Sequence, residues 1–176
     1  DPAHDGTDTD SDGDCDRGDE DDGGEGDEEG DERGQREMMR VGHGEGDGIP
    51  SLVVDRYGDY LAVQTLSQGT DRAKGELVAA LVDLLQPKGI VERNDPRVRT
   101  LEGLEQTVSV LHGEVPETVE VAEGEVRFRV DLRKGQKTGL FLDQRENHLA
   151  ARQYARGRVL DGFTYDGGFA LQVARQ

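Results

Sequence analysis

The chain has 176 residues, enough for one ordinary domain or for a small domain joined to part of another. Its net charge of -18 is concentrated at the start, because residues 1–40 hold 18 acidic residues against 4 Arg. A single cysteine, Cys15, excludes a disulfide framework or a cysteine-based zinc site within one chain, and no apolar run approaches the roughly 20 residues of a membrane-spanning helix. We therefore expect a soluble, cytoplasmic protein with no metal site and no membrane contact.

Residues 1–40 are predicted to be a disordered acidic tail with an unknown partner. Asp, Glu and Gly dominate this segment, and so few apolar residues cannot offset the entropy cost of ordering it. Within it, residues 8–13 followed by Asp19 match most of the spacing of a calcium-binding loop. Because that match lacks the final Glu and flanking amphipathic helices, the solvated tail is the preferred interpretation and a calcium-responsive protein the alternative.

Residues 41–123 have the pattern of a small α+β domain. The glycine-rich stretch at 42–50 predicts a tight turn, since Glu45 and Asp47 would repel a phosphate. Good helix caps, Thr70 and Asp71, precede an apolar stripe with helical spacing that includes Leu77, Leu81 and Leu84. Strands are expected on both sides of this helix, at residues 52–54, 60–66, 89–93, 107–112 and 118–122, with a hairpin joining the first two.

Residues 124–176 have the pattern that opens a doubly wound α/β sheet. Alternation predicts a half-buried strand at 126–131, and Asp143 is expected to cap a helix over 144–155 with Leu149, Ala150 and Tyr154 on its inner face. A strand at 158–161, a glycine-bearing turn at 162–168 and an apolar run at 169–173 follow. The backbone of such a glycine turn can approach a nucleotide-like cofactor closely.

Three segments in order carry a resemblance to a known family: residues 45–59, 135–145 and 160–169. Together they resemble the class I S-adenosylmethionine-dependent methyltransferases of large-subunit ribosomal RNA, specifically the cytosine-carbon-5 group. In that family a small central domain joins an RNA-binding PUA domain to a Rossmann-like catalytic domain. The resemblance implies that residues 41–123 are the central domain. It also implies that 124–176 are the hairpin, helix, first strand and glycine loop of a truncated catalytic domain.

The resemblance also implies S-adenosyl-L-methionine as cofactor. Amides of the glycine loop would reach its carboxylate, Asp161 its ammonium group, and the hydroxyls of Thr164 and Tyr165 would add contacts. Asp166 would be unfavourable beside that carboxylate unless it points away. Residues 137–145 resemble the segment that forms a second wall of the cofactor site in that family, and other interpretations stay open there: Phe141 can be core and Arg145 a surface charge. The implied cofactor residues are Thr138, Phe141, Gln144, Arg145, Asp161, Phe163, Thr164, Tyr165, Gly167, Gly168 and Phe169.

The expected function is methylation of large-subunit ribosomal RNA at cytosine carbon 5. This chemistry generally needs a cysteine thiolate; Cys15 is no candidate, so no catalytic residue is expected before Gln176, and the chain alone is expected to be inactive. The alternative is a non-catalytic RNA-binding or acidic-tail interaction protein derived from a methyltransferase, and a homodimer stays open. The candidate RNA contacts, which are equally well read as a solvated strand face, are Arg127, Arg129, Arg133, Lys134 and Lys137.

Overall fold

The structure is a computed structural model that describes residues 37–175. The preceding acidic segment, with Cys15 and the candidate calcium loop, lies outside the described residues. The strands are β1 (Met38–His43), β2 (Leu52–Tyr57), β3 (Tyr60–Thr65), β4 (Gly89–Asn94), β5 (Thr107–Gly113), β6 (Val119–Glu123) and β7 (Val126–Val130). The helices are η1 (Gly44–Asp47), α2 (Gln68–Arg72), α3 (Lys74–Leu85), α4 (Val98–Leu101), η2 (Leu142–Gln144), α5 (Arg145–Tyr154) and α6 (Gly168–Val173).

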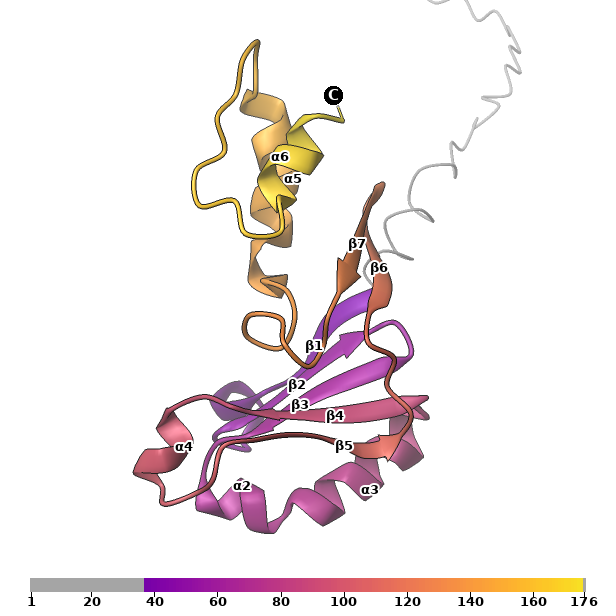
Figure 1. The fold of residues 1–176 in the computed structure, drawn as a ribbon, viewed down its shortest axis with the longest axis vertical. Coiled ribbons are helices and arrows are strands. Elements are labelled where there is room, and N and C mark those ends of the chain that lie inside the picture. Colours follow the sequence, from indigo (N-terminus) through magenta and orange to yellow (C-terminus); the bar gives the residue numbers. More distant parts are fainter. Residues whose placement is uncertain (1–36, 176) are drawn as a thin grey trace, which may run out of the picture.

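A mixed sheet of β1 to β5, in the order of the sequence, forms the body (Figure 1). Neighbouring strands are antiparallel except β3 and β4, which are parallel and joined by α2 and α3. The predicted hairpin of β2 and β3 is confirmed, with Tyr57 opposite Tyr60 across its turn. β1 was not predicted; it begins at the buried Met38, three residues before the boundary expected at residue 41.

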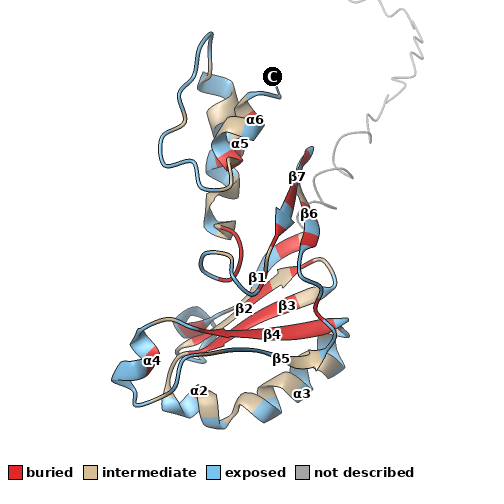
Figure 2. Ribbon diagram, viewed as in Figure 1, coloured by how far each residue is buried: buried red, intermediate tan, exposed pale blue. Residues whose placement is uncertain are grey.

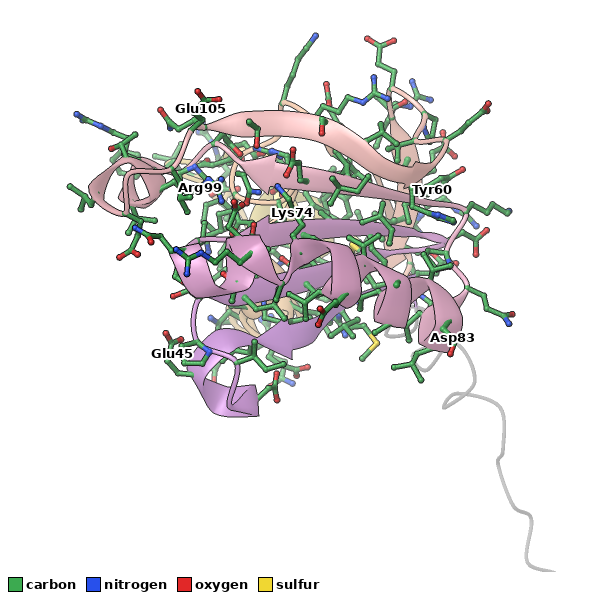
Figure 3. The ribbon with its side chains drawn as sticks, turned by 90° about the horizontal axis from the view of Figure 1, so that it is seen from below. Glu45, Tyr60, Lys74, Asp83, Arg99 and Glu105 are labelled. Carbon is green, nitrogen blue, oxygen red and sulfur yellow. The ribbon has the colours of Figure 1, made fainter. Side chains whose placement is uncertain are left out.

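The helix α3 covers one face of this sheet (Figure 3). Its stripe packs on alternating residues of the central strands and is only partly buried, so each of its side chains contributes less than the roughly 1.5–3 kcal/mol of a fully buried one. The cap that starts this helical region is Ser67 rather than the predicted Thr70 and Asp71, because the Ser67 hydroxyl accepts from the Thr70 amide. Leu84, predicted on the inner stripe, is exposed; the packed residues are Leu77, Val78, Leu81, Val82 and Leu85.

The hairpin of β6 and β7 covers the other face. Apolar residues of both strands, among them Val121 and Phe128, join Tyr57 and Val91 of the sheet in one buried cluster (Figure 2). The strand expected at 118–122 therefore exists as β6. The prediction that it completes the sheet around the helix is wrong, because β6 pairs with β7 in a separate two-stranded sheet. The alternation expected for the strand at 126–131 is confirmed, because Arg127 and Arg129 point outward between buried neighbours.

Beyond the hairpin, η2, α5 and α6 form an arm that stands away from the sheet (Figure 1). Asp143 lies within η2 and makes no capping bond to α5, contrary to the prediction. Tyr154, predicted on the inner face of α5, is 82% exposed, and His148 is the buried residue there. The strand expected at 158–161 is not formed, because no strand of the described residues lies beside it to complete a ladder. The helix start at the apolar run is confirmed as α6.

Candidate functional site

The turn between α5 and α6 is held by two aspartates. Asp161 Oδ2 accepts hydrogen bonds from the Thr164 hydroxyl (2.9 Å) and the Ala170 amide (3.1 Å). Asp166 Oδ1 accepts from the Gly168 amide (3.0 Å). These contacts satisfy N–H groups that have no partner inside a helix at its first turn. Asp161 Oδ1, by contrast, accepts no hydrogen bond from residues 37–175.

The backbone of this turn enters the left-handed region three times, at Phe163 (φ 61°), Tyr165 (φ 47°) and Gly167 (φ 81°). Only glycine adopts this region freely, so two non-glycine residues there mark a constrained loop. Within the described part of the chain, the amides of residues 163–166 make no hydrogen bond. Open amides in a turn of alternating handedness form an anion-binding concavity.

Phe141 packs against this turn and forms an aromatic wall with Tyr165. The rings of Phe141 and Tyr165 meet edge to face with 5.6 Å between centroids. The Lys137 ammonium lies 4.1 Å from the centroid of the Phe141 ring and 3.3 Å from the Asp143 carboxylate. The Lys137 ammonium therefore makes a cation–π contact with the face of the Phe141 ring.

The floor is a buried histidine that the sequence reasoning missed. His148 Nδ1 lies 2.8 Å from Glu123 Oε1, and its ring meets Phe169 edge to face at 4.5 Å. Gln172 Nε2 donates to the Glu123 carbonyl at 2.8 Å and to Glu123 Oε1 at 3.3 Å, so the hairpin, α5 and α6 meet at Glu123. His148 follows Gln144 by one helical turn, a signal that the sequence does contain; its partner Glu123 is 25 residues away and had no such signal.

These groups enclose a pocket of about 230 Å³. Seven of the predicted cofactor residues line it, together with His148 and Asp166. Asp166 thus lies at the pocket, but its Oδ1 is engaged by the start of α6. The predicted residues brought together are Phe141, Gln144, Phe163, Thr164, Tyr165, Gly168 and Phe169.

Four predicted residues do not line this pocket. Thr138 is 1% exposed, and its hydroxyl is bonded to Asp55 and Tyr57 of β2. The Arg145 side chain donates to the Met38 carbonyl of β1 and lines a separate cavity beside that strand. The two others, Asp161 and Gly167, belong to the turn itself, and Asp161 lines an adjoining groove with Leu160 and Phe169.

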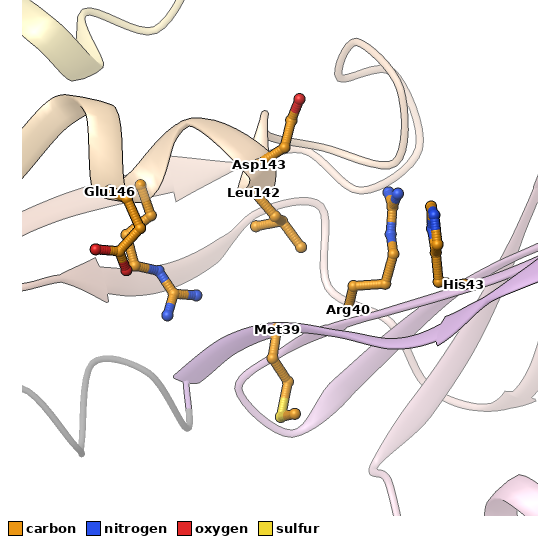
Figure 4. A pocket seen from close by; sticks show the side chains of 7 residues that line it. Met39, Arg40, His43, Leu142, Asp143 and Glu146 are labelled. Atoms are coloured by element: carbon orange, nitrogen blue, oxygen red, sulfur yellow. The ribbon is translucent and has the colours of Figure 1, made fainter. Parts of the chain in front are cut away.

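A second cavity, of about 410 Å³, lies between β1 and the η2–α5 segment (Figure 4). Arg40 and His43 reach toward it from β1, and Leu142, Asp143 and Glu146 come from the other side. Arg40 is committed to a bidentate ion pair with the buried Asp55 (2.8 and 3.0 Å), which raises the pKa of its guanidinium. Acidic and basic groups alternate here, so the cavity favours neither sign of charge.

The predicted RNA contacts do not form one cluster. Arg127 and Arg129 share the outward face of β7, where Arg129 pairs with Glu120 at 3.0 Å. Arg133 donates to the Val115 carbonyl at 2.8 Å, and Lys134 is exposed in the following turn. Lys137 belongs to the aromatic wall. Across residues 37–175, no three His, Cys, Asp or Glu side chains are grouped so as to hold a metal ion, and no helix has the length and apolarity to cross a bilayer.

Part of the chain is similar in sequence to known methyltransferases. Residues 97–175, which include the whole pocket, match a family described as S-adenosylmethionine-dependent methyltransferase. The chain is 42% identical over 139 residues to ribosomal RNA large subunit methyltransferase I of Shigella boydii. It is 46% identical over 133 residues to the protein of the same name from Aliivibrio fischeri. These alignments cover 78% and 74% of this chain but only 35% and 34% of the relatives, so the chain spans about a third of their length.

Solved structures agree on the fold. One neighbour is a Streptococcus mutans protein assigned as a SAM-dependent methyltransferase, with a TM-score of 0.64 and 24% identity. Another is SMU.776, assigned as a methyltransferase and crystallised with S-adenosylhomocysteine (SAH), with a TM-score of 0.65 and 26% identity. The likeness covers 79% of this chain in both cases, and 36% and 35% of the two neighbours.

Proposed function

We propose that this chain is part of an S-adenosylmethionine-dependent methyltransferase that modifies large-subunit ribosomal RNA at carbon 5 of a cytosine. The observation that carries the proposal is the pocket between the Asp161–Gly168 turn and the Phe141 wall, because it lies inside the segment that matches the methyltransferase family. In this proposal residues 124–175 open a Rossmann-like catalytic domain and residues 41–123 are a small central domain.

The residues of the turn fit the amino-acid end of the cofactor. The open amides of residues 163–166 suit its carboxylate, and the free Oδ1 of Asp161, in the groove that adjoins the pocket, suits its ammonium group. Phe141 and Tyr165 supply aromatic surface beside this end. The pocket, at about 230 Å³, is below the roughly 300–1,000 Å³ of most small-molecule sites, so it suits one end of such a cofactor. When bound, the cofactor supplies the methyl group.

Support for the RNA substrate comes from the relatives, both named for large-subunit ribosomal RNA. The choice of cytosine carbon 5 rests on the resemblance of the three sequence segments. That reaction needs a nucleophile at carbon 6, and residues 37–175 contain no cysteine, so we assign no catalytic residue within them. The exposed Arg127 and Lys134 are proposed as RNA contacts.

Calorimetric titration of S-adenosylhomocysteine into the full chain tests the cofactor site. We expect a micromolar dissociation constant, raised about tenfold or more by Asp161→Asn, because that change keeps an acceptor for Thr164 and Ala170 but removes the charge that faces the ammonium. The matched control is Asp166→Asn, which also keeps its bond to α6 and should bind no more weakly than the wild type. Absence of heat with the wild-type chain would contradict the proposed cofactor.

The RNA substrate is tested in the cell that makes the protein. We expect disruption of its gene to remove one 5-methylcytosine from large-subunit ribosomal RNA, measured by mass spectrometry of nuclease digests. Loss of a methyl group from another nucleotide would contradict the cytosine assignment. An unchanged set of ribosomal RNA methylations would leave the non-catalytic alternative as the better reading.

A further inference from the structure

A short backbone segment, residues 136–141, connects the central sheet to the pocket. On the side of the segment that faces the sheet, the Thr138 hydroxyl donates to Asp55 Oδ2 at 2.5 Å, so it accepts from the Tyr57 hydroxyl, 3.0 Å away. Tyr57 in turn accepts from the Leu140 amide at 3.0 Å. The Tyr57 hydroxyl therefore uses both its donor and its acceptor capacity on this one segment.

These contacts are fully buried. Asp55 and Tyr57 are 0% exposed and Thr138 is 1% exposed. Gly139 packs so closely against β7 and β2 that an added Cβ would lie 2.7 Å from Val130 Cγ1 and 3.1 Å from Tyr57 Cζ. Burial also raises the pKa of Tyr57 to about 12, so its hydroxyl stays protonated and able to donate even in alkaline solution near pH 10.

On its other side, the same segment is held by Tyr165 of the glycine turn. The Tyr165 hydroxyl accepts from the Gln136 amide at 2.8 Å and donates to the Gly139 carbonyl at 3.2 Å. Gly139 is thus in contact with both tyrosines, Tyr57 from β2 and Tyr165 from the turn. Phe141, which forms the pocket wall against the Tyr165 ring, follows two residues later.

We propose that Tyr57 is a positioning residue for the pocket: through residues 136–141 it fixes Phe141 and Tyr165 in the arrangement that accepts a ligand. The central sheet then does more than support the arm. Through the Tyr57 and Thr138 hydroxyls it sets the shape of a pocket that Tyr57 does not line. The nature of the ligand rests on the proposed function; the mechanical link between Tyr57 and Tyr165 does not.

Three hydroxyl deletions in the full chain test the link: Tyr57→Phe, Tyr165→Phe and both together. Each single change removes only a hydroxyl, whose hydrogen bonds are buried at Tyr57 and partly exposed at Tyr165. We expect each to raise the dissociation constant of S-adenosylhomocysteine about three- to tenfold. The double variant should bind about as weakly as either single variant, because a segment that has lost the contacts of one tyrosine is no longer held in place by those of the other. Additive losses, or an unchanged constant for Tyr57→Phe, would overturn the proposal.

The control for general destabilisation is Val63→Ala. Val63 is equally buried but faces α3, away from residues 136–141, so this variant should lose stability and keep the wild-type dissociation constant. If it binds as weakly as Tyr57→Phe, the positioning role is wrong.

Hydrogen exchange without ligand separates this inference from the proposed function. The Gln136 amide is bonded to Tyr165 and not to Tyr57. We expect Tyr57→Phe to speed exchange of this amide at least threefold. Val63→Ala should speed it by no more than its loss of global stability accounts for. Equal exchange in Tyr57→Phe and wild type would refute the link even if the cofactor binds, and faster exchange would uphold it even if the cofactor does not.

Discussion

Gly168 determines how closely α6 can approach α5. A Cβ at this position would lie 2.5 Å from His148 Cε1 and 2.7 Å from its Nε2, and His148 is held in place by Glu123. We expect Gly168→Ala to displace the start of α6, to lower the free energy of unfolding of the arm by about 1–3 kcal/mol and to weaken S-adenosylhomocysteine binding. Urea denaturation followed by circular dichroism, with calorimetry, measures both effects.

The same turn offers a matched control. At Gly162 an added Cβ meets nothing within 4 Å, and the backbone is not left-handed. Gly162→Ala should therefore change stability by no more than about 0.5–1 kcal/mol and can stabilise the turn by restricting the unfolded chain. Equal behaviour of the two alanine variants would contradict the close packing inferred at His148.

For single residues, the sequence motifs led to residues that the fold brings together, while their role toward a cofactor stays a prediction. Phe141 and Tyr165 were predicted from their segments, and both line the pocket. Thr138 lies in the same motif, yet its hydroxyl turns toward Asp55, 83 residues away in sequence. A pattern of residue types does not say which way a short polar side chain faces, because that depends on partners brought together only by folding.

Among the elements, β4 carries a carboxylate whose ionisation the fold controls. Glu92 is buried and accepts hydrogen bonds from Lys74 (2.9 Å) and Ser109 (2.8 Å). Burial alone would raise its pKa, but these bonds outweigh burial and lower it below 4.5. Because the folded pKa lies below the unfolded one, the ionised form stabilises the fold above about pH 4.5, and this contribution is lost as pH falls through the folded pKa.

We therefore expect Glu92→Gln to be less stable than wild type near neutral pH and to lose less stability on acidification. Urea denaturation at a series of pH values down to about 3 measures the difference. The exposed Glu117, replaced by Gln, is the control and should follow the wild-type curve. Parallel curves for wild type and Glu92→Gln would contradict the assigned role of the carboxylate.

Element type was easier to predict than pairing. Alternation identified residues 118–122 as a strand, but not that β6 would pair with β7 and leave the central sheet. Residues 158–161 have strand composition, yet a strand forms only beside a hydrogen-bonded neighbour, and none lies there among residues 37–175. Both differences have one cause, since local sequence encodes propensity while the ladder partner is set by the rest of the fold.

On the scale of the whole molecule, burial is uneven between the sheet and the arm (Figure 2). Every residue of β4 is buried, whereas α5 buries only His148 and α6 only Gly168 and Gln172. Leu160 and Phe163, in the turn between these helices, are almost fully exposed. Regions with few buried apolar contacts open at a lower free energy than the core, so the arm and the sheet should differ in native-state hydrogen exchange.

We expect amides of α5 and α6 in the full chain to exchange by local opening with little dependence on denaturant, and those of β3 and β4 only by global unfolding. S-adenosylhomocysteine, which contacts the arm in the proposed function, should then protect the α5 and α6 amides selectively. At a ligand concentration of about 100 times the dissociation constant, linkage gives about 2.7 kcal/mol of protection if the opened arm does not bind. A common opening free energy for arm and sheet would contradict this division. Protection of the sheet alone would mean that the ligand binds elsewhere, because only a site built from α5, α6 and their turn couples binding to the opening of the arm.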